Sequence, residues 1–300
     1  MNNTLDLDEK YTHQDVNIVR SFYEFFDSQE KLIDWMKKRP NPNLTVYEEL
    51  KDSKIVVVIP TINRNSNLAL NCINNIYSKL TTVLVESGRT KLFNYARSVN
   101  LGVKRAMRLE PNWIIISNDD VIKIDTTNKL VSELNKLDHN VIKTVFTNPP
   151  GRYHSVEHGL CKPRSRIFSL LSRVSARSYD FLSLYKKFNI EWTHAPPKYP
   201  YRFFFNDFHK FILTVSFSIF SSTFIAENDG KLFDETYING VEDIDLSYQL
   251  NSDPKNYAFV DFKISEKVGA SLGRNEAREL RDIANLSYLN KKLREGTLRI

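Results

Sequence analysis

The sequence predicts an α/β fold with a mainly parallel sheet and helices on both of its faces. Two observations carry this prediction: an unbroken β-branched run from Ile55 to Ile59, and the alternation of helices and strands that follows it. A continuous apolar run is typical of a strand buried on both faces, and such an alternation is typical of parallel strands joined by right-handed crossovers. Hydrophobic residues make up 41% of the 300 residues, which suffices for one large core or two smaller ones.

The first segment, residues 1–50, is predicted to be a helical extension. Apolar residues recur at helical spacing around Phe22 and again around Trp35, until Pro40 and Pro42 interrupt the pattern. We expect helices in front of the sheet.

The second segment, residues 51–150, is predicted to be the first half of an α/β core. Apolar stripes of helical period separate its predicted strands, which are Ile55–Ile59, Thr82–Val85 and Trp113–Ile116. Ligands of open α/β sheets bind beyond the carboxyl ends of the strands. The polar residues that follow each strand are therefore candidates for a binding site.

Residues 151–212 are predicted to be a basic, aromatic insertion that covers one end of the sheet. From Cys161 to Lys210, ten Lys or Arg stand against three Asp or Glu, a surplus of +7 against a net charge of +6 for the whole chain. Residues 213–273 then carry two further strand-like runs and a dense acidic cluster, and residues 274–300 form a closing amphipathic helix.

Charge and cysteine content narrow the class of protein. Cys72 and Cys161 are too few for a disulfide framework, and no basic-then-apolar stretch opens the chain, so we expect a cytoplasmic protein. The longest apolar stretch, Phe211–Ile225, is interrupted by hydroxyl residues and is too short to span a bilayer. The positive net charge favours an anionic partner, which could be a nucleotide, a nucleic acid or an anionic membrane.

Two clusters of acidic residues are candidates for a functional site. Asp119 and Asp120 directly follow a predicted buried strand, where hard carboxylate oxygens suit Mg²⁺ or Mn²⁺, although a solvated turn would look similar. A second group lies between Asp234 and Asp245, where Gly240 allows a turn and a helix is expected to start at about Glu242. Charges that cap a helix N-terminus explain part of this second group but not all of it.

The order of these motifs resembles a known family. The run Val57–Arg64, then Asn118–Asp120, then Phe233–Leu246 is similar to the family 2 glycosyltransferases, and the likeness extends from about Lys54 to Gly273 apart from the insertion. That resemblance implies the GT-A fold, a Rossmann-like three-layer α/β/α sandwich. In that fold residues 51–150 would be the half that binds the nucleotide sugar, residues 213–273 would be the acceptor and catalytic half, and the insertion at 151–212 would lie on the acceptor side. It also implies an inverting, metal-assisted enzyme that transfers a sugar from a nucleotide-diphosphate sugar, a UDP-sugar being slightly favoured.

The resemblance also implies roles for particular residues. Asp120, together with Asp119, would hold Mn²⁺ or Mg²⁺ on the diphosphate. Asp243, with Glu242 beside it, would take the proton from the acceptor hydroxyl of a glycan, a lipid-linked glycan or a protein. The residues that would bind the donor are Pro60, Thr61, Asn63, Arg64, Glu86, Asn94, Arg97 and Asp119.

Departures from the family pattern leave alternatives open. Glu86 stands where relatives carry an aspartate, and Lys267 lies near the position of a usual histidine, so Lys267 could contact phosphate in place of a third metal ligand. An exposed helix face would explain Asn94 and Arg97 as well as a donor site does.

Two other functions remain as alternatives to a transferase. The first is a degenerate relative that binds nucleotide or glycan without turnover. The second is a nucleic-acid-binding protein, which the basic aromatic insertion suggests but which leaves the acidic motifs unexplained, so no nucleic acid is expected. The insertion itself fits a peripheral membrane contact, a lid over a soluble acceptor, or an ordinary helical subdomain.

Overall fold

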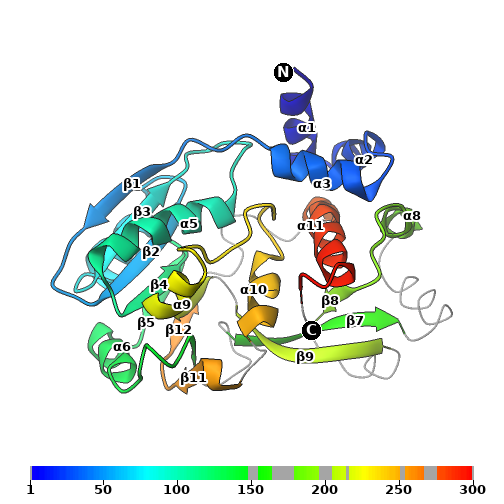
Figure 1. The fold of residues 1–300 in the computed structure, drawn as a ribbon. Coiled ribbons are helices and arrows are strands. Elements are labelled where there is room, and N and C mark those ends of the chain that lie inside the picture. The colour runs from blue at the N-terminus through cyan, green and yellow to red at the C-terminus, as the bar shows by residue number, and fades with distance from the viewer. Residues whose placement is uncertain are drawn as a thin grey trace.

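The main sheet has seven strands, in the order β1-β3-β2-β4-β10-β6-β11 (Figure 1). The computed structural model describes residues 2–147, 155–163, 179–195, 205–213, 216–250, 254–266 and 276–298, and the fold is given for these residues. The strands of this sheet are β1 (Thr45–Glu49), β2 (Ile55–Thr61), β3 (Thr81–Glu86), β4 (Trp113–Ser117), β6 (Thr144–Thr147), β10 (Phe217–Ser221) and β11 (Tyr257–Val260).

The pairing of these strands is mixed, so the prediction of a mainly parallel sheet is confirmed only in part. β2 pairs in parallel with β3 and with β4, and β6 pairs in parallel with β11. β1 is antiparallel to β3, and β10 is antiparallel to both β4 and β6. Every residue of β10 is buried, like those of β2. A strand buried on both faces has the same apolar sequence pattern whether it is parallel or antiparallel to its neighbours.

Helices cover both faces of the sheet, which confirms the predicted α/β fold. On one face, Ile55, Val57 and Ile59 of β2 pack with residues of α4 (Asn67–Asn71), the π-helical turn Cys72–Ile76 and α6 (Thr127–Leu134). On the other face, Val56 and Val58 pack with residues of α5 (Tyr95–Ala106), α9 (Ser222–Glu227) and α10 (Glu242–Leu250). Short 3-10 turns follow α5 and precede β11, at Met107–Leu109 and Pro254–Asn256.

A second apolar core lies beside the sheet and is built mainly from helices (Figure 1). It contains buried residues of α2 (Val16–Glu24), α3 (Gln29–Lys38), α8 (Tyr179–Lys187) and α11 (Glu276–Arg294), with Tyr11 of α1 (Asn2–Thr12). The helical N-terminal segment is confirmed, and the closing helix begins at Glu276 as expected. The edge strand β1, which also lies in the first fifty residues, was not predicted.

The insertion contributes a separate three-stranded sheet. β7 (Ser155–Pro163) pairs antiparallel with β8 (Thr193–Ala195) and β9 (Phe205–Leu213), and β9 runs beside α10. A further pair, β5 (Val121–Ile124) and β12 (Ile264–Glu266), lies next to the main sheet. Most of the basic residues of the insertion lie outside the described residues, as does Lys267. Lys187 is an exception: its Nζ donates a hydrogen bond to the Tyr23 carbonyl oxygen, 2.9 Å away, and so points to the helical core.

No helix among the described residues is both long enough and apolar enough to cross a membrane.

Close packing of α5 on the sheet gives a test of this architecture. A Cβ atom at Gly102 would lie 2.4 Å from Cγ1 of Val58 and 2.9 Å from Cγ2 of Val85, closer than packed carbon atoms approach. Gly102→Ala should therefore lower the free energy of unfolding by about 1–3 kcal/mol, since overpacking outweighs the higher helix propensity of alanine. Urea unfolding measures the change. Lys104→Ala, on the exposed face of the same helix, is the control, and a Gly102→Ala protein as stable as the parent would contradict this packing.

Candidate functional site

The carboxyl ends of three neighbouring strands meet at one edge of the main sheet. Thr61, at the end of β2, is paired in register with Glu86 at the end of β3, and β4 lies on the other side of β2. The chain thus turns to opposite sides of β2, first to β3 and later to β4. In open α/β sheets, ligands bind at such a switch point between neighbouring strands.

Hydrogen bonds join the loops that follow these strands. The Thr61 hydroxyl donates to Oδ2 of Asp119 at 2.7 Å, which links the ends of β2 and β4. The backbone N–H of Arg64 donates to Oε2 of Glu86 at 2.8 Å, which links the loop after β2 to the end of β3. The structure therefore brings together Thr61, Arg64, Glu86 and Asp119, as well as Pro60 and Asn63, which flank Thr61 in the chain.

Asp120 has a buried carboxylate oxygen that lacks a partner. Its side chain is only 6% exposed, and Oδ1 has no hydrogen-bond partner. Burial raises the pKa of Asp120, and the charge of Asp119 raises it further; burial likewise raises the pKa of Asp119, against the hydrogen bond from Thr61. An orphaned carboxylate oxygen next to a second carboxylate fits a bound hard cation, which would satisfy the oxygen and offset both charges.

The described residues supply two carboxylates for a metal ion at this edge. Among them, no group of three or more His, Cys, Asp or Glu is arranged to hold a metal ion. A site of one or two carboxylates completed by substrate phosphates and water is the usual arrangement for Mg²⁺. Lys267, the predicted phosphate contact, lies outside the described residues.

The second acidic pair, Glu242 and Asp243, begins α10 as predicted. Glu242 is 4% exposed and its Oε2 has no hydrogen-bond partner, whereas Oδ1 of Asp243 accepts a hydrogen bond from the Ile244 N–H at 2.9 Å. Burial raises the pKa of Glu242 to about 8, and the neighbouring charge of Asp243 adds to the effect. Burial also raises the pKa of Asp243, to about 6.

The backbone before this pair differs from the predicted glycine turn. The residues with positive φ are Asn239, at 55°, and Val241, at 74°, and the second is unusual for a β-branched side chain. Gly240 serves close packing instead, because a Cβ there would lie 2.9 Å from Oδ1 of Asp282 on α11. Strain of this kind collects at functional sites, where the surrounding structure holds the residue in place.

Tyr95, in the first turn of α5, lies between the two acidic pairs. Its hydroxyl donates to Oδ1 of Asn118 at 3.1 Å, and its backbone N–H donates to Oδ1 of Asn239 at 2.8 Å. Burial raises its pKa well above the ordinary value, and the charges of Glu242, Asp243, Asp120 and Asp119 all add to the rise. Both acidic pairs, more than 120 residues apart in the chain, therefore lie within electrostatic range of this ring.

Asn94 and Arg97 have partners within the protein, so the interpretation as an exposed helix face is wrong for both. Asn94 is 1% exposed and caps α5; its Nδ2 donates to the carbonyl oxygens of Glu235 at 3.1 Å and Tyr237 at 2.9 Å. Arg97 donates to the carbonyl oxygens of Arg39 and Pro40. These contacts fix the acidic loop and the N-terminal segment against α5, and a contact of either residue with a donor stays a prediction.

A half-buried lysine links the acidic segment to the closing helix. Lys292 of α11 lies between the carboxylates of Asp234, at 3.2 Å, and Asp245, with which it forms a closer ion pair. The Tyr288 hydroxyl also donates to Asp234, at 2.8 Å. Sequence reasoning missed Lys292 and Tyr95, because nothing near either residue in the chain marks it as different from an ordinary helical residue.

The raised pKa values of the second pair predict how stability depends on pH. Glu242 and Asp243 hold their protons more tightly in the folded state than at their ordinary pKa values of 4.5 and 3.8. Their contribution to stability is therefore complete below about pH 4 and is lost as the pH rises through about 6 to 8. Glu242→Gln removes the buried charge, so it should stabilise the protein by on the order of 2 kcal/mol at about pH 9 and change little at about pH 4.

Urea unfolding of both proteins across this pH range measures the difference. A Glu242→Gln protein that is destabilised equally at every pH would contradict the burial of an unpartnered carboxyl at this position.

Comparison with known proteins adds no relative. No model of a protein family matches the chain, and no curated protein is significantly similar to it in sequence.

Proposed function

We propose that the chain is an inverting, metal-assisted glycosyltransferase of the GT-A type, similar to family 2. In this proposal it moves a sugar from a nucleotide-diphosphate sugar, a UDP-sugar being slightly favoured, to the hydroxyl of a glycan, a lipid-linked glycan or a protein. The observation that carries the proposal is the position of Tyr95, at the carboxyl edge of an α/β sheet: its hydroxyl donates to Asn118 beside one acidic pair, its N–H donates to Asn239 near the other, and both pairs lie within electrostatic range of its ring. One pair has the chemistry to hold a metal ion and the other to take up a proton.

On the donor side, Asp120 and Asp119 are the residues that would hold Mn²⁺ or Mg²⁺. The cation would offset the negative charge that develops on the departing diphosphate. Thr61 keeps Asp119 oriented through its hydrogen bond of 2.7 Å. Glu86, whose carboxylate accepts a hydrogen bond from the Arg64 N–H, would contact the ribose or base of the nucleotide.

On the acceptor side, Asp243 is the proposed base. Burial raises the pKa of both Asp243 and Glu242, which moves the basicity of the pair toward the range that favours proton transfer near neutral pH. Because the two carboxyl groups interact, their titration belongs to the pair. The hydrogen bond from the Ile244 N–H favours the ionised form of Asp243, whereas Oε2 of Glu242 has no partner, and this difference supports Asp243 as the base.

Release of nucleoside diphosphate from nucleotide sugars tests the proposal. Most transferases hydrolyse their own donor slowly when no acceptor is present, so a panel of UDP-, GDP-, CDP- and dTDP-sugars should include one that the protein cleaves in the presence of Mn²⁺. Binding of a donor without any cleavage, with or without acceptor, would instead favour a degenerate binding protein. If the protein binds neither a donor nor a nucleotide, the proposed function is ruled out.

A further inference from the structure

A small polar pocket lies beside the acidic segment, between parts of the chain that are far apart in sequence. Its volume is about 150 Å³, and its walls come from the end of α1, the loop that leads into α5, the residues before Gly240, and the first half of α11. The charged side chains that line it are Lys91, Arg278, Arg281 and Asp282. This space suits a small polar ligand.

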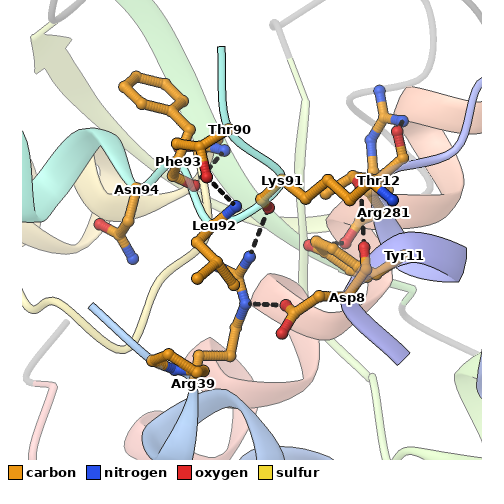
Figure 2. A network of polar contacts seen from close by, with 12 residues as sticks. Asp8, Tyr11, Thr12, Arg39, Thr90, Lys91, Leu92, Phe93, Asn94 and Arg281 are labelled. Atoms are coloured by element: carbon orange, nitrogen blue, oxygen red, sulfur yellow. Dashed lines mark hydrogen bonds and ion pairs between the residues drawn. The ribbon is translucent and has the colours of Figure 1, made fainter. Parts of the chain in front are cut away.

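Buried contacts hold the walls of this pocket in place (Figure 2). Arg39 pairs with Asp8 of α1, both side chains being at most 2% exposed, and also donates to the carbonyl oxygen of Lys91 at 3.0 Å. The Tyr11 hydroxyl donates to the carbonyl oxygen of Arg281 at 3.0 Å. In this way α1 is fastened both to the loop before α5 and to α11, so the pocket exists before any ligand enters.

Asp282 contributes a carboxylate without a partner. Among the described residues it makes neither a hydrogen bond nor an ion pair, although it lines the pocket. Arg278 and Arg281 act on it only at longer range, and burial raises its pKa to about 7. A carboxyl group in this state is an acceptor, or when protonated a donor, for the hydroxyl of a ligand.

The pocket adjoins the proposed base. Oδ1 of Asp282 faces the Cα of Gly240, two residues before Glu242, and no Cβ fits between them. The charge of Asp243 raises the pKa of Asp282, and the charge of Asp282 raises that of Glu242, so the three carboxyl groups share one electrostatic environment. A ligand in the pocket would therefore lie close to the group that takes the proton.

The charges of the lining determine the kind of ligand. Lys91 is ion-paired with Glu9, and one nitrogen of Arg281 donates to the carbonyl oxygens of Thr12 and His13. The two arginines still outnumber the single carboxyl group of Asp282 in the lining, which favours an anion, while that carboxyl group and the hydroxyl of Thr90 favour a ligand that carries hydroxyls.

We propose that this pocket binds the acceptor end of the substrate, and that this end is a hydroxylated phosphate. Arg278, Arg281 and Lys91 would contact the phosphate group, and Asp282 would contact a hydroxyl. The role of this ligand as acceptor rests on the proposed function, whereas the binding of a hydroxylated phosphate to the pocket does not.

Calorimetric titration of the full chain with glycerol 3-phosphate tests the proposal, with glycerol and inorganic phosphate as partial probes. We expect glycerol 3-phosphate to bind more tightly than inorganic phosphate and glycerol not to bind. Asp282→Asn and Arg278→Gln should each weaken binding by about tenfold or more, the usual effect of losing a charged hydrogen bond. Glu279→Gln, the same kind of change at an exposed neighbour on α11, should not weaken it, and thermal unfolding verifies that each variant is folded.

The outcomes separate this proposal from the proposed function. The proposal for this pocket is wrong if glycerol 3-phosphate does not bind the parent protein. It is also wrong if Asp282→Asn leaves the binding unchanged, or if inorganic phosphate binds as tightly as glycerol 3-phosphate. A parallel titration with UDP and Mn²⁺ should be unaffected by Asp282→Asn. If that titration shows no binding to the parent while glycerol 3-phosphate binds, the pocket stands and the glycosyltransferase proposal fails.

Discussion

Asp120→Ala is expected to abolish the Mn²⁺-dependent part of nucleoside diphosphate binding and to leave the fold intact. Asp120 ends in a buried oxygen that nothing in the protein satisfies, so its carboxylate supports a ligand more than it supports the core. Removing it should even relieve the repulsion from Asp119, which contributes to its raised pKa. Calorimetric titration with UDP, with and without Mn²⁺, measures the effect, and thermal unfolding measures the fold.

The matched control for this variant is Asp138→Ala. Asp138 is an exposed carboxylate in the turn after α6, away from the ends of the central strands, and it should not affect nucleotide binding. An Asp120→Ala protein that binds nucleotide and metal like the parent would show that Asp120 does not bind the metal ion.

Asp243→Asn is expected to lower turnover by roughly 10² or more and to leave donor affinity nearly unchanged. Asparagine keeps the size and the hydrogen bond to the Ile244 N–H, but it cannot accept the proton of the acceptor. Steady-state kinetics with a cleaved donor and its acceptor give kcat, and titration gives the donor affinity. In the parent, kcat should rise with pH through about 6, because Asp243 must be ionised to act as base.

Glu242→Gln decides between the neighbouring carboxyl groups. Loss of turnover in Glu242→Gln, together with retention in Asp243→Asn, would assign the base to Glu242. Equal loss in both variants would indicate that the two carboxyl groups titrate as one unit. In either case, the stability of the Glu242→Gln protein at high pH tests separately whether the Glu242 carboxyl group is buried.

Local patterns predicted the elements that bury apolar faces. The β-branched run of β2 and the helical stripe of α5 specify their own structure, because burial of one face or two requires that spacing. The position of Asp119 and Asp120 followed from the strand that precedes them. The start of α10 at Glu242 followed from acidic residues, which are favourable near the positive end of a helix.

Features that depend on distant parts of the chain were not predictable in this way. β10 is antiparallel to both β4 and β6, and the five buried residues of the strand do not encode that direction. Tyr95 and Lys292 acquire their roles from partners on other elements, and Asp282 acquires its role from the pocket that those elements enclose. Gly240 was assigned to a turn, but the approach of α11 is what excludes a side chain there.

A thermal-shift screen of nucleoside diphosphates with and without Mn²⁺ tests the central claim most directly. If Asp119 and Asp120 form a metal-dependent donor site, one nucleoside diphosphate, with UDP the first expectation, should raise the melting temperature with Mn²⁺ by more than the separate effects of the metal and the nucleotide. At a concentration of about 100 times Kd, the added stability should be about 2.7 kcal/mol. If no nucleoside diphosphate shows this combined effect, the chain does not bind a nucleotide-sugar donor through a metal ion, and the account is wrong.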